Sequence, residues 1–278
     1  MGNSSVRTRE FGARIRILRE GLGLPGYKLA ADLELVGSTI SRLESGSKNA
    51  IGVTALNSLL TVCGLRGNAL KEYLTRWSTE DNGYFVAPHG DQLPDNLLAL
   101  MIHDDVATSI ADYELSYIPG LLQTENYIRA LFPALGVAEK HIDAGVRTRL
   151  GRQQLVNRNN APDLSFFIHE NALRTPFGED QVMHEQMVSL LMASAQPNIS
   201  IRILPLSTRQ LCSHASFRLM KFDTIEPVGY TEGLGASMFV ERPSDIDRYR
   251  SVLNHLDVAA LDEAQSATML HSMEKLYG

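Results

Sequence analysis

The sequence predicts a mostly α protein with two domains: an N-terminal domain of five helices and a C-terminal α+β domain with a small sheet. Apolar residues recur at three- and four-residue spacing between residues 7 and 77, which is typical of amphipathic helices. Residues 78–95 then place glycines and prolines among acidic side chains, as in a linker. Beyond them, short apolar runs at 164–169 and 200–204 indicate strands. We therefore expect domains at 1–80 and 97–278 with a linker at 81–96.

The composition is that of a globular protein. The chain has 278 residues, of which 44% are hydrophobic and 21% charged. No apolar run approaches the ~20 residues of a membrane span. The N-terminus lacks the apolar core of a secretion signal, so we expect a cytoplasmic protein. Cys63 and Cys212 are isolated, and we interpret them as reduced core thiols.

The charge is divided unequally along the chain. Residues 1–80 carry 11 Lys and Arg against 7 Asp and Glu, a net charge of +4. Residues 81–278 carry 15 against 25, a net charge of −10. A basic N-terminal domain suits a polyanionic partner, whereas the acidic remainder does not.

The N-terminal helices follow from the apolar spacing. Residues 7–21 form a helix with Phe11 and Ile15 on one face and arginines on the other. Two short helices fill residues 23–46, with a tight turn at Glu34-Leu35. Their inward residues are expected to be Leu29, Ala30 and Leu33, then Val36, Ile40 and Leu43. Helices at 53–63, with Gly64 as its stop, and at 68–77 complete the domain.

The second short helix leaves a small polar face outward. Gly37, Ser38, Ser41 and Arg42 lie opposite its apolar residues. A narrow helix with such a face suits the major groove of DNA.

The runs Lys28–Ala31 and Ser38–Gly46 resemble the Xre-type helix-turn-helix of phage-repressor-like regulators, over residues 8–66. The resemblance implies binding to double-stranded DNA. The expected DNA-binding residues are Tyr27, Lys28, Gly37, Ser38, Thr39, Ser41, Arg42 and Lys48. It also implies a partly buried structural pair between Arg19 and Glu44. The chain departs from the pattern at Gly26 and Gly37, where the family often has glutamines, and at Pro25 and Val36, where a Ser or Thr cap is usual.

The C-terminal elements are expected in a mixed order. They are helices at 106–117, 125–131 (capped by Thr124) and 139–157, a strand at 164–169, a helix at 179–195, strands at 200–204, 216–222 and 228–232, and helices at 245–258 and 262–277. The run Ile118–Thr124, with residues 166–174 and 198–206, resembles the C-terminal domain of actinobacterial Scr1-like (DUF5753-type) regulators. Their genes often sit beside that of a small partner protein.

No pattern of catalytic or metal-ligating residues is present. His169 and Glu170 are adjacent and point to opposite faces of an expected strand, and the nucleophile-elbow, P-loop and zinc-protease motifs are absent from the sequence. We expect no enzyme activity and no cofactor.

Three functions remain open. The first is a transcriptional regulator controlled through its C-terminal domain, and the second is an antitoxin-like module that holds a small partner protein. The third is a sensor with a ligand pocket at Tyr113, Gln123, Tyr127, Glu170 and Arg174. Because the outward face of the second short helix offers few base readers, we also expect a homodimer through residues beyond about 97.

Overall fold

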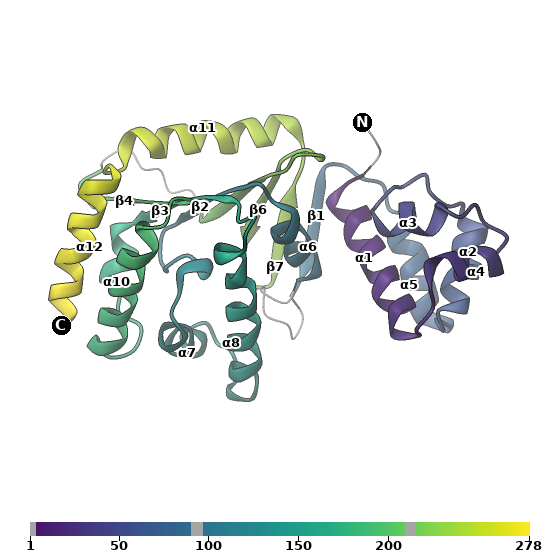
Figure 1. The fold of residues 1–278 in the computed structure, drawn as a ribbon, viewed down its shortest axis with the longest axis horizontal. Coiled ribbons are helices and arrows are strands. Elements are labelled where there is room, and N and C mark those ends of the chain that lie inside the picture. Colours follow the sequence, from purple (N-terminus) through teal and green to yellow (C-terminus); the bar gives the residue numbers. More distant parts are fainter. Residues whose placement is uncertain (1–3, 90–96, 209–214) are drawn as a thin grey trace. The chain divides into compact units, whose positions relative to one another are not determined.

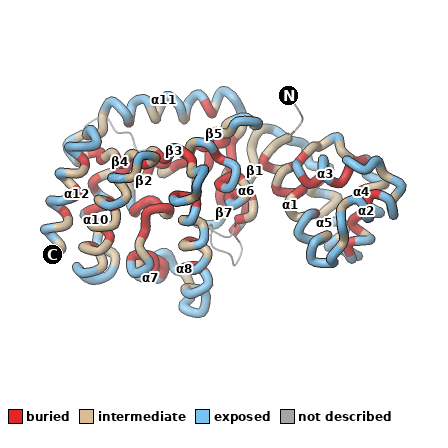
Figure 2. The backbone as a smooth tube through the Cα atoms, in the orientation of Figure 1, coloured by how far each residue is buried: buried red, intermediate tan, exposed pale blue. Residues whose placement is uncertain are grey.

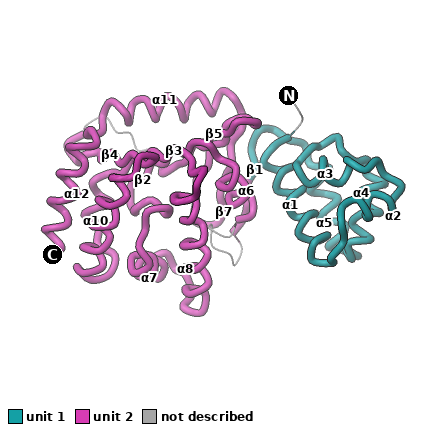
Figure 3. The backbone as a smooth tube through the Cα atoms, in the orientation of Figure 1, with its two compact units in different colours: residues 1–85 teal, residues 86–278 magenta. Residues whose placement is uncertain are grey.

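The structure is a computed structural model that describes residues 4–89, 97–208 and 215–278. The chain divides into two compact units, residues 1–85 and 86–278 (Figure 3). The division falls inside the segment predicted as a linker.

The N-terminal unit is built from five helices in its described residues. They are α1 (Val6–Gly21), α2 (Gly26–Asp32), α3 (Thr39–Glu44), α4 (Val53–Val62) and α5 (Gly67–Ser78). Ser5 and Thr8 begin α1 with a capping box, in which each side chain accepts a hydrogen bond from the other's backbone N–H. Gly64 follows α4 at a φ of 88°, so the predicted stop lies in the left-handed region that favours glycine.

One apolar core holds these helices together. Figure 2 colours the buried stretches of these helices red. The buried side chains of the core include Phe11 and Ile15 of α1, Leu29 of α2, and Ile40 and Leu43 of α3. Helices α4 and α5 add Leu56, Leu59, Leu60 and Trp77. Helices as short as α2 and α3 are unstable alone in water, so packing into this core maintains them.

The C-terminal unit contains a seven-stranded mixed sheet. Its strands are β1 (Tyr84–Pro88), whose first two residues precede the boundary between the units, β2 (Ser109–Glu114), β3 (Asp163–His169), β4 (Ile199–Leu204), β5 (Phe217–Lys221), β6 (Val228–Glu232) and β7 (Ala236–Val240). They lie in the order β1-β7-β6-β5-β2-β3-β4. Strands β2, β3 and β4 are parallel to one another, β5 pairs antiparallel with both β2 and β6, and β6 pairs antiparallel with β7.

Helices cover both faces of the sheet (Figure 1). They are α6 (Leu98–Val106), α7 (Glu125–Ala134), α8 (Glu139–Gln153), α9 (Glu170–Arg174), α10 (Asp180–Ser194), α11 (Pro243–Ala259) and α12 (Glu263–Tyr277), with short 3₁₀ turns η2 (Gly120–Leu122) and η3 (Gln154–Asn157). Helix α11 runs along one face, where Leu256 packs with Tyr113, Phe167 and Phe217 of the strands. Helices α7, α8 and α10 lie on the other side.

The predicted helix at 106–117 is wrong. Residues 98–106 form α6, and Ser109–Glu114 form β2. Apolar residues 106, 110 and 113 fit a helix by spacing, but β2 pairs with β3 on one edge and β5 on the other. Pairing on both edges therefore overrides the local pattern. Strands β1 and β7 and helices α6 and α9 were not predicted. The other expected elements each overlap an observed element of the same type.

Two further expectations concern the described residues. Cys63 is buried, and desolvation raises the pKa of its thiol, while Cys212 lies outside the described residues. Over the three described ranges, no helix is both long and apolar enough to cross a lipid bilayer.

Candidate nucleic-acid interface

The turn between α2 and α3 is closed by two backbone hydrogen bonds. Leu35 N donates to Ala30 O at 2.8 Å, and Glu34 N donates to Ala31 O at 3.1 Å. This is the Schellman arrangement, which needs a left-handed residue after the helix. Glu34 occupies that position at a φ of 54°, and it is the one non-glycine residue with positive φ among those described. The turn therefore sets the direction of α3 at the cost of local strain.

Helix α3 lies against α1 at very close range. A Cβ added to Gly12 of α1 would stand 2.7 Å from the carbonyl oxygen of Glu44 and closer still to that of Leu43. Gly46 is equally confined, because its Cβ would stand 2.7 Å from Cα of Arg9 and its φ is 87°. Two glycines thus allow the backbones to approach and fix α3 on α1.

The Arg19–Glu44 pair reinforces this contact, since the structure brings the two side chains together. Arg19 donates from Nε to Glu44 Oε1 at 2.5 Å and from Nη2 to Oε2 at 3.0 Å. Arg16 also reaches Oε2, at 3.3 Å, and Arg19 Nη1 donates to Leu24 O at 2.7 Å. The hydrogen bond to Glu44, followed by its charge, raises the pKa of Arg19 above its ordinary value. A bidentate pair of this kind fixes orientation as well as distance.

The outward face of α3 is polar. Ser38, Ser41 and Arg42 are exposed, and Gly37 precedes them without a side chain. Ile40 and Leu43 are buried against α1 and α2, as the helical spacing predicts. Thr39, which was expected to be a DNA-binding residue, is 8% exposed and therefore lies on the inner side of α3. On α2, Lys28 is exposed, and Tyr27 is 77% exposed.

The predicted burial of Val36 is wrong. It was predicted to pack into the core as the first apolar residue of the second helix, but 75% of it is exposed. The reason is that α3 begins only at Thr39, after a turn in which Thr39 N donates to Val36 O at 2.8 Å. Val36 precedes the helix and does not share its inward face. Ser38 is the cap residue, and its side chain makes no capping hydrogen bond.

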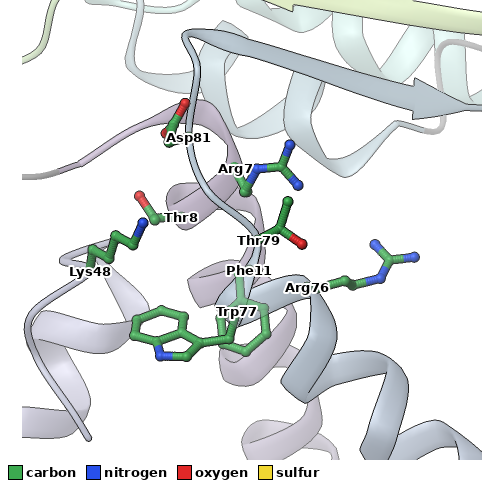
Figure 4. A pocket seen from close by; sticks show the side chains of 8 residues that line it. All are labelled: Arg7, Thr8, Phe11, Lys48, Arg76, Trp77, Thr79 and Asp81. Carbon is green, nitrogen blue, oxygen red and sulfur yellow. The ribbon is translucent and has the colours of Figure 1, made fainter. Parts of the chain in front are cut away.

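Lys48 lies just beyond α3, beside a shallow hollow of about 10 Å³ (Figure 4). Phe11 and Trp77 line the hollow with Arg7, Thr8, Arg76, Thr79 and Asp81. Figure 4 shows the Lys48 amine pointing toward Thr8 and the Arg76 side chain extending away from Trp77. Room for about one water molecule excludes an organic ligand. Lys48 therefore contributes a half-buried positive charge near the end of α3.

Comparison with known families agrees with these features. A profile described as a helix-turn-helix domain matches residues 10–73. A second profile, described as a domain of unknown function (DUF5753), matches residues 97–272, which is more than half of the chain. The chain belongs to the DUF5753 family. Both halves of the predicted architecture are thereby confirmed, and the N-terminal unit is a helix-turn-helix DNA-binding domain. A search of curated proteins found no match.

In the DUF5753 domain, the residues of the predicted ligand pocket make local contacts. Tyr113 is fully buried on the sheet face under α11, with its ring centroid 5.7 Å from that of Phe217. Gln123 and Tyr127 both bind the backbone of Ile118, at 2.6 and 3.3 Å.

The other two predicted pocket residues form a local pair. Glu170 binds Arg174 Nε at 2.6 Å and accepts a hydrogen bond from Leu206 N at 2.9 Å. The five residues are thus held in local hydrogen-bond networks and an aromatic core, and their grouping as one ligand pocket stays a prediction.

A buried ion network on the DUF5753 sheet was not predicted. Arg218 of β5 binds Asp112 of β2 at 2.7 Å and Asp104 of α6 at 3.0 Å. Asp104 also binds Arg152 of α8 at 2.7 Å. Glu114 lies two residues along β2 from Asp112, and burial, followed by the Asp112 charge, raises its pKa to about 8. The sequence signal was hidden because β2 was predicted as a helix, and Asp112 and Arg218 are 106 residues apart.

Proposed function

We propose that the protein is a sequence-specific transcriptional regulator that binds DNA as a homodimer and receives its regulatory input through the DUF5753 domain. The main support is the outward face of α3, where Ser38, Ser41 and Arg42 are exposed. The Arg19–Glu44 pair holds the other side of this helix on α1. A rigidly held helix with a polar outer face can enter the major groove without losing core packing.

The distribution of charge supports DNA as the partner. The net charge of +4 in residues 1–80 favours phosphates, and the −10 of residues 81–278 disfavours them. We infer that Arg42 reads a base edge and that Lys48 holds a phosphate. Arg42 offers a planar fork on the outward face of α3, whereas Lys48 is a point charge beyond its end.

Dimerisation is proposed because one domain presents few base readers. Gly37 has no side chain and Thr39 is buried, so Ser38, Ser41 and Arg42 remain on α3. In a dimer, two helix-turn-helix domains bound to an inverted repeat would add their binding free energies, with half-site centres ~34 Å apart. We place the dimer contact in residues beyond about 97.

Regulation is favoured over catalysis by the surroundings of the histidines. His89 bonds Ser237 Oγ at 3.0 Å, His103 bonds Ala99 O, and His169 accepts from Asn171 N at 3.2 Å. His184 bonds Glu274 O at 3.1 Å. These contacts give the rings of these four histidines a structural role. A small partner protein and a small-molecule ligand remain the two predicted inputs, and either would raise the melting temperature of the full chain on binding.

The test is selection of binding sites from a random duplex library with the full chain. The expected product is an inverted repeat whose half-sites lie about one helical turn apart. A single unrepeated site would contradict the dimer, and failure to enrich any sequence would contradict sequence-specific binding. The Arg42→Ala variant, taken through the same selection, should lose preference at one base pair of each half-site.

A further inference from the structure

The segment just before α3 is exposed but offers little hydrogen bonding to DNA bases. Val36, Gly37 and Ser38 come immediately before the first helical residue, and all three are exposed. Ser38 alone among them carries a side-chain hydrogen-bonding group. A Cβ placed on Gly37 would meet nothing within 4 Å, so the surface around Val36 is open.

This segment is also the part that a recognition helix brings to the bases. In helix-turn-helix proteins the N-terminal residues of the second helix contact base edges in the major groove. Adenine, guanine and cytosine are distinguished there by donors and acceptors, and thymine in addition presents an apolar C5-methyl group. For a branched apolar side chain at this position, the complementary group in the major groove is the C5-methyl group of thymine.

We propose that Val36 reads a thymine in each half-site by packing its branched side chain against the C5-methyl group. This inference rests on the proposed function and adds a second specificity-determining residue to Arg42. It also accounts for a branched apolar side chain that is 75% exposed just before the helix begins.

A stability role for Val36 is disfavoured by its contacts. Its backbone oxygen accepts the hydrogen bond from Thr39 N, and that bond does not depend on the side chain. The side chain does not belong to the buried core of the N-terminal unit. Val36→Ala should therefore leave the melting temperature of the full chain unchanged, which separates loss of a base contact from loss of folding.

Removing the methyl group from the DNA tests the contact directly. Uracil differs from thymine by that group alone, so each thymine of the selected site is replaced by uracil in turn. The loss of one buried methyl weakens binding roughly fourfold. Wild-type protein should show this loss at one thymine of each half-site, and Val36→Ala should bind the thymine and uracil sites with equal affinity. Val53→Ala is the matched control, because Val53 is also exposed but begins α4, outside the α2–turn–α3 segment.

The outcomes separate the two proposals. If the wild-type chain selects a site but binds it equally well with uracil at every thymine, the role of Val36 is overturned. The proposed function as a sequence-specific regulator is then unaffected. The role is also overturned if Val36→Ala remains as sensitive to uracil as the wild type. If the wild-type chain selects no sequence, both proposals are overturned.

Discussion

Arg19 and Glu44 are 25 residues apart in the sequence, and their side chains join α1 to α3 through two hydrogen bonds of 2.5 and 3.0 Å. Glu44 is 8% exposed and the Arg19 side chain is also largely buried, so removal of Glu44 leaves the Arg19 guanidinium without its main partner in a desolvated place. The pair therefore holds the helix on which the proposed recognition depends.

Glu44→Ala should destabilise the N-terminal unit by about 3 kcal/mol, as expected for breaking a buried ion pair. Trp77 is the single tryptophan of the chain and packs on Phe11 at 5.1 Å, so its fluorescence during urea unfolding reports on this unit. Glu72→Ala is the control, because Glu72 is exposed and its pair with Arg76 lies on the surface. Equal shifts for both variants would show that the Arg19–Glu44 pair contributes no more than a surface pair.

Gly12→Ala should destabilise the same unit by about 3 kcal/mol, the upper end for overpacking. The new methyl group would meet the backbone oxygens of Leu43 and Glu44, which cannot rotate away. Gly37→Ala introduces the same group where nothing lies within 4 Å and should change stability little. An unfolding midpoint for Gly12→Ala equal to that of Gly37→Ala would mean that α1 and α3 are not in close contact.

Glu34→Gly should stabilise the N-terminal unit by about 1 kcal/mol. Glu34 has a φ of 54°, where a residue with a Cβ is strained and glycine is not. Glu34→Ala keeps the Cβ and should give no such gain, so the pair of variants separates backbone strain from loss of charge. Urea unfolding followed by Trp77 fluorescence measures both, and a lower midpoint for Glu34→Gly would contradict the strained turn.

The stability of the DUF5753 domain should fall between about pH 4.5 and pH 8. The pKa of Glu114 is raised from 4.5 to about 8, so the folded state keeps a proton that the unfolded state has lost. The stabilisation is therefore fully present below pH 4.5 and is lost as the pH rises through 8. Glu114→Gln stays neutral and should flatten the melting-temperature profile over this range. The exposed Glu125→Gln is the control and should follow the wild type; a wild-type slope retained by Glu114→Gln would assign it to another group.

The sequence was most informative where structure is local. The helices of the N-terminal unit and the Thr124 cap follow from spacing and capping chemistry, which act within a few residues. Val36 was misplaced because the helix start depends on the turn at Glu34, and no local rule predicts a left-handed glutamate. Strand β2 was missed because its two partners lie about 50 and 100 residues further along the chain. The Asp112–Arg218 pair could not be predicted for the same reason, because the two residues meet only when β2 pairs with β5.

If α3 reads DNA through its outward face, Arg42→Ala and Lys48→Ala should weaken DNA binding in two different ways. Both variants of the full chain are titrated with the selected site and a scrambled duplex at several salt concentrations. Arg42→Ala should cost about 1–3 kcal/mol on the selected site alone, because a base contact is lost. Lys48→Ala should weaken both duplexes equally and lower the salt slope by about one per protomer. Equal weakening of both duplexes by Arg42→Ala would contradict the account, since Arg42 would then contact only phosphate.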